Sequence, residues 1–207
     1  IYASATLMSS FLLIWVGKKI DDINIFKFAF YVILLLSFSC FFFSKVSSIT
    51  FLFVAVFLMR FSGQGLMSHT ASTTIARYFT KSRGKALSIS WFGLSTAEFI
   101  LPVLIVYLLT ITAWQNIWIS ISILILILLP LTSFFLTKNL DFESREQQDL
   151  NNVNKKEIKQ WKRIEVIKDY RFYIICLNML AMPWIATGVF VYQSFITEAK
   201  DWGSFVI

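Results

Sequence analysis

The chain has 207 residues, of which 57% are hydrophobic and only 15% are charged, and its mean hydropathy is +0.69. Soluble globular proteins have about 45–50% apolar and about 25% charged residues, so the composition excludes a disordered chain and points to a membrane protein. The two cysteines, Cys40 and Cys176, both lie in apolar segments, which excludes a disulfide-stapled secreted domain. The formal net charge of +7 is compatible with a nucleic-acid partner, so the positions of the basic residues must decide that question.

Six apolar segments have the length and composition of transmembrane helices, which need about 20 residues to cross a bilayer. In chain order they are residues 1–17, 28–44, 50–74, 87–110, 115–137 and 172–196. No basic stretch precedes the first segment, so it does not resemble a cleavable signal peptide. The segments are also longer than the strands of a membrane barrel, which have about 10 residues with alternating polarity. We therefore expect an all-α fold, a polytopic transmembrane helical bundle.

The basic residues are concentrated in alternate loops. Sixteen of the 19 Lys and Arg residues fall in the segments 18–27, 75–86 and 138–171. Because cytoplasmic loops of membrane proteins are rich in Lys and Arg, we expect these three loops to be cytoplasmic. The charge is then a signal of topology, and no nucleic-acid partner is predicted. We expect an integral protein of the plasma membrane, as in a bacterial inner membrane.

The third basic loop is polar and much longer than the others, so it predicts a boundary between two membrane domains. We expect an N-terminal transmembrane part at residues 1–137, a cytoplasmic linker at 138–171, and the start of a second transmembrane part at 172–207. Within the linker, four large apolar residues recur three apart among charged residues: Ile158, Trp161, Ile164 and Ile167. This spacing predicts a short amphipathic helix on the membrane surface; a plain solvated linker is the alternative.

Two ionisable residues lie well inside the apolar segments. Arg60 is about ten residues into the third segment and Glu98 about eleven into the fourth, so both are expected near the middle of the membrane. Intramembrane charges are costly and usually functional. We expect both to face the bundle interior and to pair, directly or through water, either for function or only to lock two helices together.

Polar residues near these charges are further candidates for binding. Gln64 follows Arg60 by four residues and so shares its face, and the flanking glycines, Gly63 and Gly65, permit close approach of a neighbouring helix. Asn178 adds a polar side chain to the last segment. His69, the single histidine, is either a proton relay or a hydrogen-bonded interior residue.

The sequence offers no constellation for catalysis. One histidine and two isolated cysteines cannot form a catalytic zinc site, and no phosphate-binding loop, dinucleotide fingerprint or nucleophile elbow occurs. We therefore predict no catalytic residue, no metal and no cofactor, and expect that the protein is not an enzyme.

Four short motifs, in order, resemble those of the major facilitator superfamily. The loop from Gly17 to Lys27 matches the superfamily's first signature at Gly17, Asp21 and Lys27, but has Asn24 in place of the second glycine. The third segment contains Arg-Phe-Ser-Gly-Gln-Gly at 60–65, similar to the motif of helix four. Arg-Tyr-Phe-Thr-Lys-Ser-Arg-Gly-Lys-Ala at 77–86 and Trp-Gln at 114–115 resemble the entries to helices five and six.

This resemblance implies a secondary transporter that works by alternating access, with the chain covering helices two to seven of a twelve-helix plan. It implies a gating role for six loop residues: Gly17, Asp21, Lys27, Arg77, Arg83 and Gly84. It also implies that Arg60 binds substrate or takes part in proton coupling. The positions of Gln64, Glu98 and Asn178 in the apolar segments make them further candidates, with Glu98 as the counter-charge of Arg60 and a possible proton acceptor. The Arg-Gly loop is similar to that of monocarboxylate and oxalate–formate carriers, which favours a small organic anion as the solute. A drug or metabolite antiporter of the same superfamily and a non-transporting membrane sensor remain as alternatives.

Overall fold

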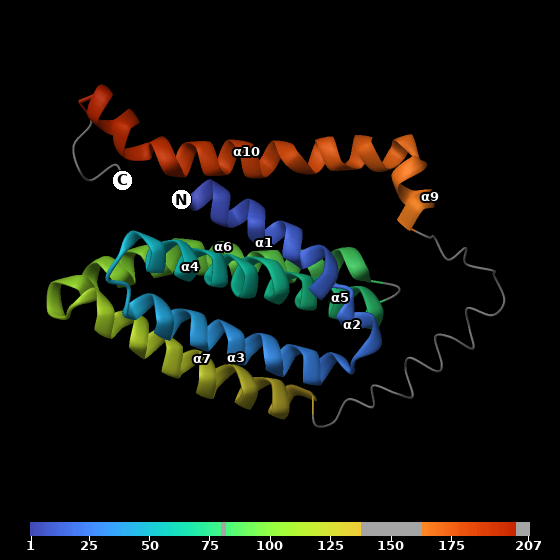
Figure 1. Ribbon diagram of the computed structural model, residues 1–207, viewed down its shortest axis with the longest axis horizontal. Coiled ribbons are helices and arrows are strands. Elements are labelled where there is room, and N and C mark those ends of the chain that lie inside the picture. Colours follow the sequence, from blue (N-terminus) through green and yellow to red (C-terminus); the bar gives the residue numbers. More distant parts are fainter. Residues whose placement is uncertain (80–81, 138–162, 202–207) are drawn as a thin grey trace. The chain divides into compact units, whose positions relative to one another are not determined.

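The structure is a computed structural model that describes residues 1–79, 82–137 and 163–201, and every regular element in these ranges is a helix (Figure 1). The chain divides into two compact units, Ile1–Asn151 and Asn152–Ile207, which are described separately. The division falls inside the predicted linker, most of which lies outside the described residues, so the predicted domain limits stay predictions.

The first unit contains eight described elements. They are α1 (Tyr2–Val16), α2 (Lys19–Asp22), α3 (Ile25–Ser44), α4 (Ile49–Met59), η1 (Arg60–Met67), α5 (Ser68–Tyr78), α6 (Arg83–Ile111) and α7 (Trp114–Thr137). The described part of the second unit contains α9 (Arg163–Lys168) and α10 (Tyr170–Ala199). An all-α bundle, as the sequence predicts, is therefore what the structure shows.

Five helical stretches in the described residues are long and apolar enough to cross a membrane: Ile25–Ser44, Ile49–Tyr78, Arg83–Ile111, Trp114–Phe135 and Tyr170–Val189. They coincide with five of the six predicted segments. The remaining predicted segment, residues 1–17, is helical as α1 but has only 15 helical residues.

Side-chain caps explain where several helices begin. The Asn24 side chain accepts a hydrogen bond from the backbone N–H of Phe26 at 2.9 Å, at the start of α3. Ser48 caps α4, and Asp169 caps α10 by accepting from the N–H of Arg171. Asx and Ser side chains satisfy N–H groups that lack a partner within the helix. Asn24, which departs from the family's usual glycine, thus has a local role in starting α3.

The helix Ile49–Tyr78 changes type in its middle third. Residues 60–67 form η1, a π-helix, between the α-helical parts α4 and α5. A π-helix has i→i+5 hydrogen bonds and is found mostly as short insertions at functional sites. It begins at Arg60 and contains both glycines of the segment.

Neighbouring helices approach η1 closely on two sides. A Cβ added at Gly63 would lie 3.3 Å from Cδ1 of Leu36 on α3, and one added at Gly65 would lie 3.5 Å from Cδ1 of Leu13 on α1. The prediction that these glycines permit close packing is confirmed. The main apolar core lies beside them and consists of the buried residues Ile20, Phe28, Val32, Phe61 and Leu66.

Serine hydroxyls join the helices around α3. Ser37 on α3 and Ser122 on α7 each donate a hydrogen bond to the other's backbone carbonyl, at 2.9 and 2.7 Å. Ser39 on α3 lies 3.2 Å from Ser62 on η1, oxygen to oxygen, and both residues are fully buried. Small polar residues of this kind are typical of interfaces between transmembrane helices, because they permit close backbones and interhelical hydrogen bonds.

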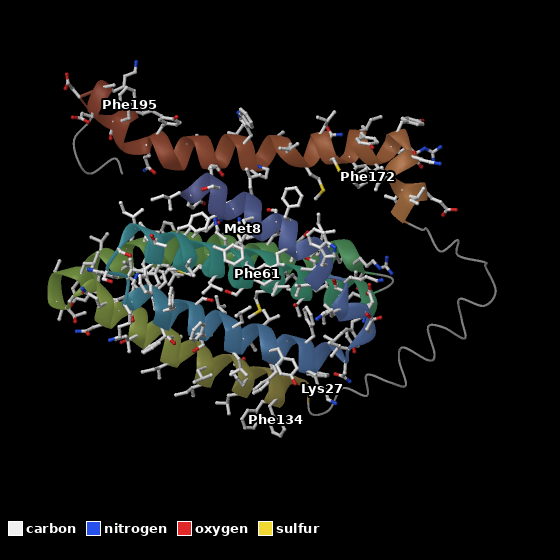
Figure 2. The ribbon with its side chains drawn as sticks, in the orientation of Figure 1. Met8, Lys27, Phe61, Phe134, Phe172 and Phe195 are labelled. Atoms are coloured by element: carbon white, nitrogen blue, oxygen red, sulfur yellow. The ribbon has the colours of Figure 1, made fainter. Side chains whose placement is uncertain are left out.

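The long helix α6 differs from the rest of the unit, because none of its residues is buried. It packs against α5 and α7. Figure 2 shows the contrast between an interior side chain, Phe61, and an outward side chain, Phe134 on α7. Large exposed apolar side chains are expected on a helix that borders lipid.

In the second unit, α9 contains the last two residues of the predicted amphipathic stripe, Ile164 and Ile167, and both are exposed. Ile158 and Trp161 lie outside the described residues. The amphipathic surface helix therefore stays a prediction.

Candidate functional site

Arg60 lies where α4 passes into the π-helix η1, in the middle of an apolar helix. The carbon at the centre of its guanidinium group is 4.3 Å from the centroid of the Tyr2 ring on α1, which is a cation–π contact. Its Nε is buried and has no hydrogen-bond partner among the described residues. The guanidinium is thus held on one flat side by an aromatic ring, while part of its hydrogen-bonding capacity is unused.

The expected direct pair between Arg60 and Glu98 is not formed. In the described part of the chain the recorded ion pair joins Asp21 to Arg77, and Glu98 is an exposed side chain on α6. The physical reason lies in the packing: α6 lies against α5 and α7, whereas η1 is enclosed by α1 and α3. Equal depth in the membrane therefore does not bring the two charges into contact.

The other predicted binding residues are spread over the chain. Gln64 lies on η1 with an exposed side chain, four residues after Arg60. Asn178 is exposed on α10, in the second unit. The structure thus brings Gln64 and Arg60 onto one element, and their roles remain untested.

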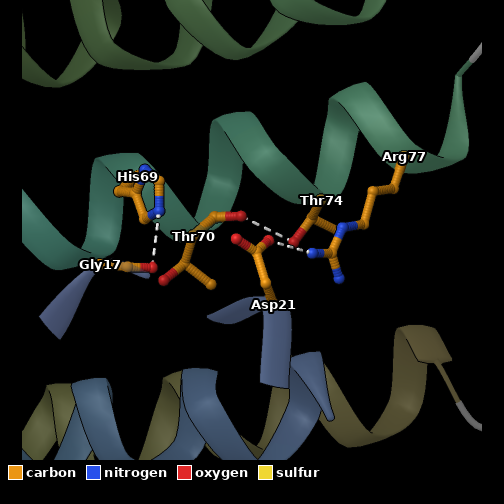
Figure 3. Close-up of polar contacts among 6 residues, drawn as sticks. All are labelled: Gly17, Asp21, His69, Thr70, Thr74 and Arg77. Atoms are coloured by element: carbon orange, nitrogen blue, oxygen red, sulfur yellow. Dashed lines mark hydrogen bonds and ion pairs between the residues drawn. The ribbon is translucent and has the colours of Figure 1, made fainter. Parts of the chain in front are cut away.

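A second group of residues joins the segment that follows α1, including α2, to helix α5, and we call it the latch: Gly17, Asp21, His69 and Arg77 (Figure 3). Nη2 of Arg77 donates a hydrogen bond to Oδ1 of Asp21 at 2.7 Å, which is also an ion pair. Nε2 of His69 lies 3.1 Å from the backbone carbonyl oxygen of Gly17. These two contacts span 56 and 52 residues of sequence, and they tie the first and last turns of α5 to the segment that follows α1.

The packing of the α1–α3 connection explains why the latch forms. Ile20, the residue before Asp21, is 1% exposed and is inserted into the apolar core. This anchor fixes the short helix α2 and leaves the Asp21 carboxylate at the surface, within reach of Arg77. Gly17 is buried, and a Cβ there would come 2.7 Å from the Leu13 carbonyl oxygen, so any larger residue would force the backbone to shift.

The ion pair of the latch contributes little stability, because both of its side chains are partly exposed. The side chains of Asp21 and Arg77 are 64% and 29% exposed, and exposed pairs contribute about 0–1 kcal/mol to stability. Such a contact adds little to the fold and can be broken at small cost.

For His69 the sequence left two interpretations, a proton relay or a hydrogen-bonded interior residue, and the structure shows a hydrogen-bonded ring. Its ring bonds to the backbone carbonyl of Gly17 (Figure 3). Thr70 follows it on α5, and Thr74 lies further along the helix, beside Asp21 and Arg77. Thr74 in turn donates to the carbonyl of Thr70 at 2.7 Å, within the same helix. The histidine thus links α5 to the end of α1.

Three of the six predicted gating residues lie outside the latch. Lys27 is exposed in the first turn of α3, and Arg83 is exposed at the start of α6. A Cβ at Gly84 would meet no atom within 4 Å. Gly17, Asp21 and Arg77 are therefore brought together, and a gating role for any of the six stays a prediction.

The described residues contain no group of three or more His, Cys, Asp or Glu side chains that could hold a metal ion. The polar chemistry available here is that of single charges and hydroxyls along the helices.

The succession of motifs, the apolar helices and the latch agree with a comparison of the chain with protein-family models. The model described as Major Facilitator Superfamily matches residues 1–207. The chain belongs to the major facilitator superfamily. No curated protein and no solved structure matches it.

Membership confirms the resemblance that the four motifs indicated. Proteins of the major facilitator superfamily are secondary transporters rather than enzymes, and they move small solutes across membranes. With its apolar helices, the chain is therefore an integral membrane protein of a transporter family.

Two features of the site were not expected from the sequence. Tyr2 lies 58 residues before Arg60, and no motif or spacing links the two. The contact of His69 with Gly17 likewise depends on how α1 packs on α4 and η1, which the sequence pattern does not reveal. Only the arrangement of the helices brings these residues together.

Proposed function

We propose that this protein carries a small organic anion across the membrane by alternating access, with proton coupling, and that Arg60 binds the anion. One observation supports this proposal most: the Arg60 guanidinium lies in a membrane helix with a buried, unpartnered Nε. Among the described residues, no carboxylate forms an ion pair with it.

The argument rests on the cost of an unpaired charge. Placing an arginine at the centre of a membrane helix costs about 2.5–3.5 kcal/mol, and an unsatisfied polar group in an apolar environment adds to that cost. The carboxylate of a solute would supply both the charge and the acceptors that are missing. Arginine suits this role because its planar fork binds carboxylates through two parallel hydrogen bonds.

Tyr2 supports the same role. Its ring covers one face of the guanidinium, and the N–H groups point along the plane of the group, away from the ring. An aromatic ring attracts the cation without neutralising its charge. Arg60 can therefore be oriented and still bind an anion.

The latch would act as the gate of this carrier. We place the loops 18–27, 75–86 and 138–171 on the cytoplasmic side, following their basic residues. The latch then closes the cytoplasmic ends of α1 and α5, and the Asp21–Arg77 pair breaks when the protein opens to that side. On this proposal residues 1–137 form one transmembrane part, the second begins at 172, and the membrane is a bacterial inner membrane.

The decisive experiment is uptake of radiolabelled monocarboxylates and dicarboxylates by the transporter reconstituted into vesicles. Arg60→Ala is expected to abolish uptake while the protein still inserts and elutes as a folded peak. Arg60→Lys, which keeps the charge but loses the fork, should retain weak uptake with a raised KM. Normal uptake by Arg60→Ala would refute the role of Arg60.

Proton coupling is tested through Glu98, the acidic residue within the predicted spans. Glu98→Gln is expected to remove the dependence of uptake on an imposed pH gradient while exchange of solute for solute continues. An unchanged response to the gradient would exclude Glu98 from coupling. Ligand binding without flux, in both wild type and variant, would instead favour a membrane sensor.

A further inference from the structure

A crevice of about 200 Å³ opens between α5 and α6. Its walls come from both helices and from the last residue of η1. The apolar part is formed by Met67, Ala71, Leu87, Trp91 and Leu94, and the polar part by Ser68, Ser72 and Ser90. Ser72 lies six residues from the end of α5, about 9 Å along the helix, so the crevice is near the latch end of the bundle.

The three hydroxyls of the crevice have no hydrogen-bond partner within the part of the chain that the structure describes. Their neighbours on the same helices behave differently. Thr74 donates to the carbonyl of Thr70, and Ser88 donates to the carbonyl of Gly84 at 2.9 Å. Hydroxyls in membrane helices are normally satisfied by such bonds, so three unused hydroxyls at one place are a feature of this crevice.

The crevice is also the end of a polar line along one helix. Starting from Arg60, residues four apart are polar: Gln64, Ser68 and Ser72. Residues at this spacing lie on roughly the same face of a helix. Gln64, Ser68 and Ser72 are all exposed in the structure, and the last two line the crevice.

We infer that this crevice is a second binding site for the carried solute, on the latch side of Arg60. The inference rests on the proposed function. The site would take a small molecule with one polar, hydrogen-accepting end and a short apolar part. The hydroxyls would donate to the polar end, and Trp91 with the leucines would contact the apolar part.

The size of the crevice limits the ligand. Sites for drug-sized molecules have volumes of about 300–1,000 Å³, so about 200 Å³ suits a smaller solute. The mixed lining also disfavours a purely apolar guest, since it would leave the three hydroxyls without partners. A short-chain monocarboxylate meets both conditions.

The test is equilibrium binding of radiolabelled butyrate to the full transporter in lipid nanodiscs. Wild type is expected to bind two butyrate molecules per chain. Arg60→Ala should retain one, in the crevice, and the double variant Ser72→Leu/Ser90→Leu should retain one, at Arg60. The control is Ser88→Leu, which changes a serine outside the crevice lining, and it should bind two.

The outcomes in which one site remains distinguish a failure of this inference from a failure of the proposed function. One site that disappears in Arg60→Ala and survives the double variant overturns the crevice and leaves the proposed function intact. One site that survives in Arg60→Ala and disappears in the double variant supports the crevice and overturns the role of Arg60. No binding to wild type overturns both. A retained phospholipid, lost in the double variant and found by native mass spectrometry without a change in butyrate binding, also overturns the inference.

A second measurement does not depend on counting sites. In a protein with Cys40 and Cys176 replaced by alanine, Ser90→Cys is expected to react with a maleimide, and saturating butyrate should slow that reaction at least tenfold. Ser88→Cys should not be protected. Equal rates with and without butyrate at Ser90→Cys would overturn the inference.

Discussion

The first unit has a packed side, around α1, α3 and η1, and an open side, along α6. The candidate functional residues are divided between these two sides. Around α3, helix α1 and η1 bury Ile20, Phe61 and Ser62, and serines join neighbouring helices. Along α6, no residue is buried. Arg60 and the latch belong to the packed side, whereas Glu98 and one of the two walls of the crevice between α5 and α6 belong to α6.

The difference between the packed side and α6 distinguishes side chains whose neighbours are fixed from side chains whose neighbours are not. On the packed side, the surrounding helices fix a side chain's neighbours, as Tyr2 does for Arg60. On α6, side chains are free to meet lipid, solute or another helix. Substitutions on the packed side should therefore change stability or affinity, and substitutions on α6 should act mainly through whatever binds there.

The largest effect is expected from removing a ring on the packed side. Phe61→Ala should lower the free energy of unfolding by about 3 kcal/mol or more, because it leaves a cavity in the core. Phe99→Ala on α6 is the matched control: its side chain is 80% exposed, and the change should stay within about 0.5 kcal/mol. Unfolding in mixed detergent micelles, followed by tryptophan fluorescence, measures both, and equal losses would contradict the distinction between the two sides.

A smaller effect is expected from Tyr2. Tyr2→Leu removes the ring that faces Arg60 and should raise the KM for the transported anion about three- to tenfold, in line with about 0.5–2 kcal/mol for a cation–π contact. Tyr2→Phe keeps the ring and should be close to wild type. Uptake into vesicles over a range of solute concentrations gives the comparison; a Phe variant as impaired as the Leu variant would assign the effect to the hydroxyl instead.

The smallest effect on stability is expected at the latch. Asp21→Asn should change the free energy of unfolding by no more than about 1 kcal/mol, because the ion pair is exposed. It should nevertheless alter the balance between inward-open and outward-open states, seen as a changed rate of labelling of a cysteine introduced into a cytoplasmic loop. Asp22→Asn changes the neighbouring carboxylate and should leave that labelling unchanged, whereas equal shifts in both variants would indicate a general effect of charge.

The sequence predicts a good part of this architecture. Long apolar segments and polar interruptions locate the five membrane-length helices, because a span must be apolar over about 20 residues. Close packing at Gly63 and Gly65 also follows from residue type alone, since a missing side chain leaves room for a neighbour. The family resemblance places Asp21 and Arg77, from two separate motifs, among the gating residues, and the structure joins them by an ion pair.

Other features depend on tertiary packing and could not be predicted. Arg60 and Glu98 have similar depths, but depth does not determine which helices are neighbours, and the direct pair is absent. The partner ring of Arg60 comes from Tyr2, whose sequence context is unremarkable for an apolar segment. The π-helix has no composition that distinguishes it from an α-helix containing two glycines.

The π-helix η1 has a mechanical consequence for the protein. It lies between Arg60 and the two latch residues of α5, His69 and Arg77, on one continuous helix. Each α-helical residue advances the chain by about 100° around the axis, and a π turn takes up extra residues for the same rotation. The number of residues in η1 therefore sets how far α5 is rotated about the helix axis relative to α4. Forming or losing a single π turn would rotate α5 and change the direction in which His69 and Arg77 point relative to Gly17 and Asp21.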